Sequence, residues 1–439
     1  MSLTKVSPSL FATSNNITSV TVGGSANTIS LTFDGSGVIT SATNNAVSVA
    51  NTAITGNIIS SQITSVANTQ LTGTITGSQI SSNTLSNTVF QTGAVENYMS
   101  AAGLGFGMRN RIINGAMVID QRNGGASVNP TDGQFIVDQW RAARSQASKL
   151  TVQQNAGAVT PPVGFSNYLG VTSSSAYSII SSDYFFLFTK IEGFNFADMA
   201  WGTANAQTIT LSFWVRSSLT GTFGGSVLNS AQNRSYPFTY TINAANTWEK
   251  ETITIAGDTS GTWIGATNGT GLQLYFGLGV GSTGSGTAGA WAAAGYQSAT
   301  GATSVVGTNG ATFYITGVQL EKGSTATSFD YRHQTTELQL CQRYFQKLPI
   351  IYGGAISTTT LGVGYVCPVD MRANATTTLL TSTPYAEIPD TTGYTASGAS
   401  INGNVYHHGG EFRISGWTSL VTGKPMWFSH DQISLSAEL

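Results

Sequence analysis

Two pairs of acidic residues are the first candidates for chemistry in this sequence. Asp132 and Asp138 are close in the chain, and Glu249 and Glu251 stand two positions apart in a strand-like segment, so they share a face. Two carboxylates roughly 5–10 Å apart across a sugar-binding cleft would hydrolyse a glycosidic bond. The segment WEKETITI is typical of a solvated strand edge, however, and close acidic pairs are usually surface charges. We therefore expect no catalytic residues and no enzyme.

A metal site and a dinucleotide site are the other chemistries to weigh. His407 and His408 could each bring an imidazole to a metal ion on a three-fold axis, but adjacent residues of a strand point to opposite faces. No Cys, His or carboxylate lies at ligand spacing beside them, so a surface loop is the better interpretation. The motif GVGSTG matches GxGxxG, yet the acidic residue expected about 20 positions later is missing. We predict a loop there, no metal and no cofactor.

Sugar binding is the chemistry that the aromatic residues favour. Flat aromatic faces pack against apolar C–H patches of sugars, while amide and hydroxyl groups supply the polar bonds. An alternative is equally well supported for the two C-terminal tryptophans, which are then core residues of a small β domain. The candidate residues for receptor or carbohydrate binding are Trp263, Trp291, Asn404, Tyr406, His407, Trp417 and Trp427.

Composition indicates a β-rich chain with few charges. Charged residues make up 9% of the 439 residues, against about 25% in ordinary globular proteins. The abundant Thr, Val and Ile suit a pleated, half-buried surface. A net charge of −2 offers no basic face for nucleic acid. The start lacks the apolar run of a secretory signal, and no stretch of about 20 apolar residues exists, so we expect no membrane insertion.

The segment 21–105 has the character of a fibre shaft. Residues 35–95 contain no charged side chain, and NTAITGNIISSQI at Asn51 is nearly repeated as NTQLTGTITGSQI at Asn68. Such repeats bury their apolar side against neighbours, here in a thin rod of intertwined chains. Like charges near a symmetry axis would repel, which accounts for their absence. The alternative is a flexible Ser/Thr/Asn linker, which would not need the repeated isoleucine register.

Period-two alternation predicts a large β domain after the shaft. In AQTITLSFWVRSS, Ile209, Leu211, Phe213 and Val215 share one face, as in a half-buried strand. In ATFYITGVQLEKG the alternation shifts phase at Gly317, which is typical of a β-bulge. Several such strands separated by Gly-rich loops indicate a jelly-roll-type sandwich.

One helix is expected, in TTELQLCQRYFQKL. Its apolar residues recur at helical spacing from Leu338 to Leu348, and Thr335 or Thr336 could cap the start. The two cysteines, Cys341 and Cys367, are too few for a disulfide framework and are interpreted as small buried hydrophobes.

Five blocks of the sequence carry a resemblance to a known family. They are MRNRIINGAMVIDQR, VDQWR, LSFWVRSS, VQLEKGSTATSFDYR and ELQLCQRYFQK, in this order between Met108 and Lys347. The chain here resembles tail fibres and minor tail proteins of tailed bacteriophages, including cyanophages, whose central domain looks like a carbohydrate-binding jelly roll. The opening LTKVSPSLF is similar to the first peptide of many fibres, and LTGTITGSQI looks like a shaft repeat.

The resemblance implies a homotrimeric virion protein, assembled in the host cytoplasm, that attaches to a bacterial surface glycan or other receptor. Its N-terminus would bind a tail, baseplate or adaptor protein. The alternative is a tailspike-type depolymerase that cleaves host polysaccharide. The expected fold is all-β: attachment peptide 1–20, shaft 21–105, jelly-roll sandwich 106–335, and short helix with C-terminal β receptor-binding tip 336–439. The proposed attachment residues are Leu3, Lys5, Val6, Leu10 and Phe11.

Overall fold

The structure is a computed structural model that describes residues 19–22, 29–33, 39–44, 108–389, 392–429 and 431–439. The chain divides into two compact units, Met1–Val89 and Phe90–Leu439. In the first unit, three strands form an antiparallel sheet in the order β1–β2–β3. The sequence repeats and the five attachment residues named above lie outside the described residues. The three strands are β1 Ser19–Val22, β2 Ile29–Phe33 and β3 Ile39–Asn44.

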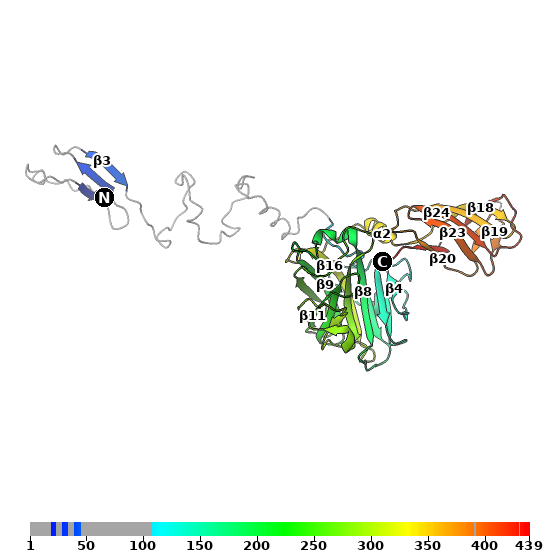
Figure 1. The fold of residues 1–439 in the computed structure, drawn as a ribbon, viewed down its shortest axis with the longest axis horizontal. Coiled ribbons are helices and arrows are strands. Elements are labelled where there is room, and N and C mark those ends of the chain that lie inside the picture. Colours follow the sequence, from blue (N-terminus) through cyan, green and yellow to red (C-terminus); the bar gives the residue numbers. More distant parts are fainter. Residues whose placement is uncertain (1–18, 23–28, 34–38, 45–107, 390–391, 430) are drawn as a thin grey trace, which may run out of the picture. The chain divides into compact units, whose positions relative to one another are not determined.

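A β-sandwich of two antiparallel sheets occupies the first part of the second unit (Figure 1), as the sequence predicted. The first sheet has six strands in the order β11–β10–β13–β8–β5–β4. Its members are β4 Gln134–Val137, β5 Trp140–Arg144, β8 Tyr184–Glu192, β10 Gly221–Leu228, β11 Ser235–Ile242 and β13 Thr270–Val280.

The second sheet has five strands in the order β12–β9–β16–β7–β6. These are β6 Leu150–Gln154, β7 Leu169–Ser173, β9 Ile209–Ser217, β12 Glu249–Ile255 and β16 Thr312–Lys322. Short elements join the sheets: parallel strands β14 Ser285–Gly286 and β15 Ser298–Ala299, and 3-10 turns Ala156–Ala158, Gly193–Asn195, Ala197–Met199 and Ser282–Gly284.

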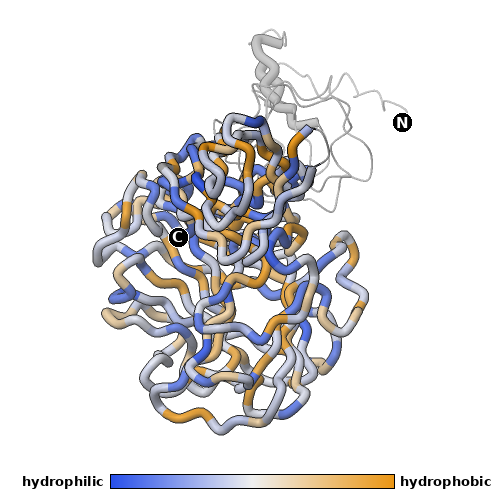
Figure 2. The backbone as a smooth tube through the Cα atoms, turned by 90° about the vertical axis from the view of Figure 1, so that its right-hand side faces the viewer, coloured by the Kyte–Doolittle hydropathy of each residue, from blue (hydrophilic) through white to orange (hydrophobic). Residues whose placement is uncertain are grey.

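One hydrophobic core lies between the two sheets. The predicted inward face of β9 is confirmed, because Ile209, Leu211, Phe213 and Val215 are all fully buried in that core. Hydrophobic and hydrophilic stretches are interspersed along the described backbone (Figure 2). Among the described residues, no helix is long and apolar enough to span a membrane.

The predicted bulge at Gly317 is present in β16. The register between β16 and β9 shifts between Thr316 and Gln319, and Gly317 has a φ of +61° that favours glycine. The bulge brings the chain against Gly115, whose carbonyl accepts a hydrogen bond from the N–H of Val318. A Cβ on Gly115 would lie 2.1 Å from the Val318 carbonyl oxygen, so this position has no room for a side chain.

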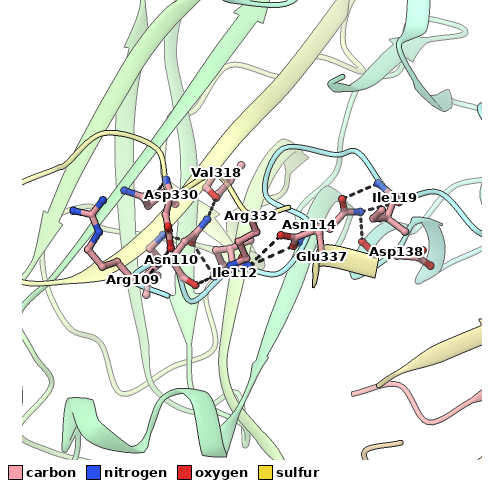
Figure 3. A network of polar contacts seen from close by, with 12 residues as sticks. Arg109, Asn110, Ile112, Asn114, Ile119, Asp138, Val318, Asp330, Arg332 and Glu337 are labelled. Carbon is pink, nitrogen blue, oxygen red and sulfur yellow. Dashed lines mark hydrogen bonds and ion pairs between the residues drawn. The ribbon is translucent and has the colours of Figure 1, made fainter. Parts of the chain in front are cut away.

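The blocks that carry the family resemblance meet in one polar network (Figure 3). The Asn110 side chain donates to the Val318 carbonyl and accepts from the N–H of Leu320. The Asn114 amide binds the carbonyls of Ile119 and Asp138, at 2.8 Å each. Asp330 accepts from the N–H groups of Arg109 and Asn110, and Arg332 donates to the Ile112 carbonyl. Glu337 accepts a further bond from the Asn114 N–H, so four of the five blocks hold one another in place.

The predicted helix is confirmed as α2, which spans Gln334–Gln342. The predicted caps were wrong: His333 is the N-cap, without a side-chain cap bond, and Thr335 and Thr336 lie inside the helix. The helix also ends before Phe345, which begins the strand β17 Phe345–Lys347. Arg343 and Tyr344, directly after the helix, turn instead to bind Glu192 of β8.

A C-terminal β domain follows the helix, with its own hydrophobic core. One sheet has the order β17–β26–β20 and the other the order β22–β21–β25–β18–β19–β24–β23. Both cysteines are buried and unbonded, as expected. The remaining strands are β18 Ile351–Ser357, β19 Thr360–Val366, β20 Thr376–Leu379, β21 Tyr385–Glu387, β22 Gly393–Thr395, β23 Ser400–Tyr406, β24 Gly409–Ser415, β25 Pro425–Phe428 and β26 Ile433–Ser436.

Salt bridges and hydrogen bonds tie this C-terminal domain to the sandwich. Arg343 makes two bonds to the buried carboxylate of Glu192, at 2.8 and 2.6 Å, and the Tyr344 hydroxyl adds a third at 2.7 Å. Arg372 donates to the Asn268 carbonyl at 2.7 Å, and the Asn268 amide returns a bond to the Arg372 carbonyl. The charged groups at this junction are thus mostly paired across it.

Candidate functional site

The outer face of the six-stranded sheet carries an aromatic floor. Alternation along β8 directs Phe185, Leu187 and Ile191 into the core and the residues between them to the opposite face. Phe188 lies opposite Tyr275 of β13, and their rings stack with centroids 5.2 Å apart and 6° between their planes. The floor is therefore a second hydrophobic cluster, separate from the core. It consists of Ala143, Phe186, Phe188, Leu228 and Tyr275, with Tyr184 and Val280 packed against it.

Polar side chains surround this floor and leave a cleft of about 420 Å³. The cleft has the mixture of aromatic, amide and hydroxyl groups that suits a sugar. It is lined by Asp132, Gly133, Arg141, Ala143, Tyr184, Phe186, Phe188, Lys190, Gln232, Gln273, Tyr275 and Gln297.

Hydrogen bonds fix several of the polar groups in the cleft. The Tyr275 hydroxyl donates to Gln273 Oε1 at 2.8 Å, and Gln273 Nε2 donates to the Asn229 carbonyl at 2.9 Å. The Tyr184 hydroxyl donates to Asp132 Oδ2 at 2.9 Å. These side chains are held before any ligand arrives, so a ligand would meet a preorganised surface.

Burial disfavours positive charge on the cleft floor. The pKa of Lys190 is lowered, first by burial and then by the nearby cations Arg141 and Arg372. Burial also lowers the pKa of Arg141, although that guanidinium stays charged at any ordinary pH. A negatively charged group placed in the cleft would oppose the effect of burial and raise the pKa values of both cations.

An exposed aromatic surface lies on the outer face of the seven-stranded sheet. Trp427 of β25 pairs in register with Tyr352 of β18, whose side chain is 71% exposed, and with Glu387 of β21. On the same sheet, Glu411 and Arg413 of β24 pair through their side chains at 3.3 Å and line a hollow of about 440 Å³ with Asn402 and Gly403. This surface combines one aromatic pair with exposed charges and an amide.

The predicted binding residues of the C-terminal domain differ in their burial and location. Trp417 is buried in the core, 2% exposed, and its indole N–H donates to the Ile414 carbonyl, as the core alternative proposed. Trp427 is half-buried, on the outer sheet face. Tyr406 is 56% exposed at the end of β23, and His407 follows in the hairpin turn. The backbone of Asn404 pairs with Glu411, and its side chain lies outside the described residues.

The structure brings Trp263 and Trp291 together, but not in the cleft. Their ring centroids are 5.7 Å apart at 82°, and both contact the buried Trp201. Trp263 donates to Asp258 at 3.1 Å and Trp291 to the Ala256 carbonyl at 2.9 Å. They are partly buried and pack against the sandwich core. We assign them to packing beside the core.

The histidine pair has a carboxylate beside it that sequence spacing did not reveal. His407 and His408 form the two-residue turn between β23 and β24, as the loop interpretation expected, and their ring centroids are 3.6 Å apart. Their carbonyls accept bonds from the N–H groups of Met371 and Cys367, which brings Asp370 within 3.7 Å of His408 Nδ1. Potential ligand atoms of Asp370, His407 and His408 lie within 4.8 Å of one another, enough for a metal ion to bridge after small side-chain movements.

The two acidic pairs considered for catalysis differ in their location and burial. Glu249 and Glu251 lie on β12, which is an edge strand as expected, and Glu249 accepts bonds from the N–H groups of Asn243 and Ala244. Asp132 is exposed at the cleft, whereas Asp138 is buried and bonded to Gln121. In the GVGSTG segment, Gly279 and Val280 end strand β13, and the remaining residues leave it through a 3-10 turn at Ser282–Gly284.

Most residues of the cleft, including Tyr184, Phe186, Lys190 and Gln297, were not predicted from the sequence. The signal was present in the segment DYFFLFTKIE, where aromatics occupy both faces of one strand. An aromatic face turned away from the core must be covered by other chain or by a ligand.

Comparisons with known proteins give no family. No protein-family model and no curated protein sequence match the chain. Among solved structures, the chain is similar to the enzymatically active domain of tailspike protein 4 of bacteriophage CBA120, at 12% identity and TM-score 0.27, over 49% of this chain and 21% of that one.

Two carbohydrate-binding modules also show similarity. The family 11 module from Clostridium thermocellum, in complex with a beta-1,3-1,4-mixed-linked tetrasaccharide, has 12% identity and TM-score 0.24, over 45% of this chain and 96% of the module. TmCBM61, in complex with beta-1,4-galactotriose, has 11% identity and TM-score 0.25, over 49% of this chain and 100% of the module. Likenesses at these TM-scores carry no conclusion about this chain.

Proposed function

We propose that this chain is a tail fibre of a tailed bacteriophage, a virion structural protein that attaches to its host by binding a surface polysaccharide. The observation that carries the proposal is the cleft on the six-stranded sheet. Tyr184, the partly exposed ring of its aromatic floor, offers a flat face for a sugar ring, and the fixed amide and hydroxyl groups of the cleft offer bonds to sugar hydroxyls. The five sequence blocks that resemble phage fibres support the same assignment.

Binding without cleavage agrees best with the carboxylates of the cleft. Asp132 is the one carboxylate among the residues that line it, and its oxygens already accept bonds from the Tyr184 hydroxyl and the Arg144 N–H. Glycoside hydrolysis normally uses two carboxyl groups flanking the bond. We therefore propose a protein that is not an enzyme. New reducing ends in a host polysaccharide treated with the purified chain would overturn this part in favour of a depolymerase.

The proposed fibre is a homotrimer anchored to the phage tail through its N-terminal residues. Three clefts per fibre and several fibres per virion would convert weak sugar contacts into firm attachment. Light scattering on the full chain should give three times the 45.8 kDa chain mass. A monomer would contradict the trimer and the shaft interpretation with it.

The cleft is tested by substitution of Tyr184, the partly exposed ring of its floor. The full chain and its Tyr184→Ala variant are compared for binding to surface polysaccharides extracted from candidate host bacteria. We expect at least a tenfold loss of affinity, since stacking of a nucleobase on one aromatic ring contributes about 1–3 kcal/mol and a sugar ring packs against the same kind of aromatic face. Val163→Ala, at a fully exposed position outside the cleft, is the matched control. Equal binding by all three proteins would reject the cleft as the glycan site.

A further inference from the structure

Lys190 is the cation of the cleft that has no partner. It follows the aromatic floor on β8, half-buried, and lies in register with Gln273 of β13. In the part of the chain that the structure describes, its Nζ makes no hydrogen bond and no ion pair. An ammonium withdrawn from water without an anion is unfavourable, so its position calls for a partner.

The carboxylates nearest to the cleft are bound elsewhere. Glu192, two residues further along the same face of β8, is held by Arg343 and Tyr344. Glu438 forms an ion pair with Arg122 and also accepts a bond from Gln139. With Asp132 bonded to Tyr184, none of the neighbouring acids that the structure describes pairs directly with Lys190, although Glu438 attracts it from a distance.

Arg141 places a second cation beside the same floor. It lies on β5 in register with Phe188, and its guanidinium carbon is 5.0 Å from the centre of that ring. Its Nε donates to the Gly133 carbonyl at 2.7 Å, and one terminal nitrogen donates to a main-chain oxygen of Leu439 at 3.4 Å. Among the described residues, Arg141 forms no ion pair with an Asp or Glu side chain, so its positive charge remains available to a ligand.

We infer that the cleft recognises an acidic polysaccharide, a polymer whose sugars carry carboxylate groups, and that Lys190 and Arg141 bind the carboxylate while the aromatic floor receives the sugar ring. The inference rests on the proposed function, since it names the ligand class of the same cleft. Two cations and one aromatic floor fit a sugar acid. A nucleic acid would need many phosphate contacts, which a chain of net charge −2 does not offer.

The test uses carboxylated polymers and their chemically reduced forms. The full chain is titrated with polygalacturonate, alginate and hyaluronate, and with the same polymers after reduction of their carboxyl groups to alcohols. We expect at least one of the acidic polymers to bind, and its reduced form to bind at least tenfold more weakly, a difference of about 1.4 kcal/mol. Raising the salt concentration should weaken only the acidic form.

Lys190→Met should reproduce the effect of carboxyl reduction. We expect at least a tenfold loss of affinity for the acidic polymer and no change for its reduced form. Lys250→Met, at an exposed position on the edge strand β12 of the other sheet, removes the same charge and should change neither affinity. Melting temperatures of both variants confirm that they fold.

The outcomes separate this inference from the proposed function. If neutral and acidic polymers bind equally well in the cleft, the ligand is a neutral glycan; this inference is wrong and the proposed function stands. If single-stranded DNA of matched charge competes as well as the acidic polymer, the cleft attracts anions without recognising sugars, and the inference is again wrong. If no polysaccharide binds, acidic or neutral, the proposed function itself fails.

Discussion

Stability of the junction between the sandwich and the C-terminal domain should fall as pH rises. Asp138 and Glu438 lie on either side of Arg122, with Arg122 Nε 3.7 Å from Asp138 Oδ1. Burial raises the pKa of Asp138 from 3.8 to about 6 and that of Glu438 from 4.5 to about 7, against the opposing attraction of Arg122. A carboxyl group with a raised pKa stabilises the fold while it is protonated, and that stability is lost as pH rises through the folded-state pKa.

The size of the effect follows from the two pKa values of Asp138. For an unfolded value of 3.8 and a folded value of about 6, linkage gives a loss of about 1.4 kcal/mol between pH 5 and pH 8. For a domain of this size that corresponds to a fall in melting temperature of about 3–6 °C. Glu438 adds a loss of the same sign, which is not additive because both carboxyl groups share Arg122.

The substitution Asp138→Asn removes the ionisable carboxyl group and keeps the shape of the side chain. The melting temperature of the full chain is measured by scanning fluorimetry at pH 5 and pH 8 for the wild type and the variant. The variant should lose about 1.4 kcal/mol less stability than the wild type across this range, since an amide does not ionise.

Asp183→Asn is the matched control. Hydrogen bonds from the Ile180 N–H, the Ser145 hydroxyl and the Tyr177 hydroxyl hold the pKa of Asp183 below its usual value. The stability that Asp183 contributes is therefore lost only as pH falls below the range tested, and its variant should shift the melting temperature equally at pH 5 and pH 8. A wild type that is more stable at pH 8, or an Asp138→Asn variant with an unchanged pH slope, would refute the reasoning.

Four further substitutions test the packing assignments. Trp417→Ala should destabilise the C-terminal domain by about 3–5 kcal/mol, whereas Trp427→Ala should cost under about 1 kcal/mol and instead weaken cell adsorption; equal melting temperatures of the two variants would contradict this. Arg343→Met leaves the buried Glu192 with only Tyr344 and should destabilise the junction by about 2–4 kcal/mol, measured by urea denaturation, while an unchanged midpoint would show the pair to be dispensable. Gly115→Ala should lower the yield of folded protein through its clash at the bulge; normal expression and melting would exclude that constraint.

Local alternation predicted the sandwich strands well, because the face of a strand such as β9 is set by its own residues. The same rule could not find the cleft. In β8 the aromatic residues occupy both faces, and a continuous apolar run predicts a strand buried on both sides. Only the pairing of β8 with β5 and β13 shows that one of those faces is a second cluster beside Arg141 and Lys190.

The alternation rule is limited in the same way when it is applied to single residues, as the two tryptophans of the C-terminal domain show. Trp427 alternates with the buried Met426 and Phe428, so the sequence indicates that its face differs from theirs. Trp417 lies beyond the end of β24, where no alternation applies, and tertiary packing alone places it in the core. Sequence reasoning therefore offered both as binding residues when only Trp427 has a face that a ligand can reach.

The residues that hold the fold together and the residues that line the cleft come from different parts of the sequence. The blocks that resemble phage fibres supply the Asn110 and Asn114 network, the bulge partner of Gly115 and the Arg343 junction. Apart from Arg141, the cleft residues come from outside those blocks, as does the whole Tyr352–Trp427 surface. Because the network fixes strand register without using the cleft side chains, the residues facing a ligand can change without disturbing the frame. Under the proposed function, this separation lets the chain alter which glycan it binds while keeping the fold that presents the cleft.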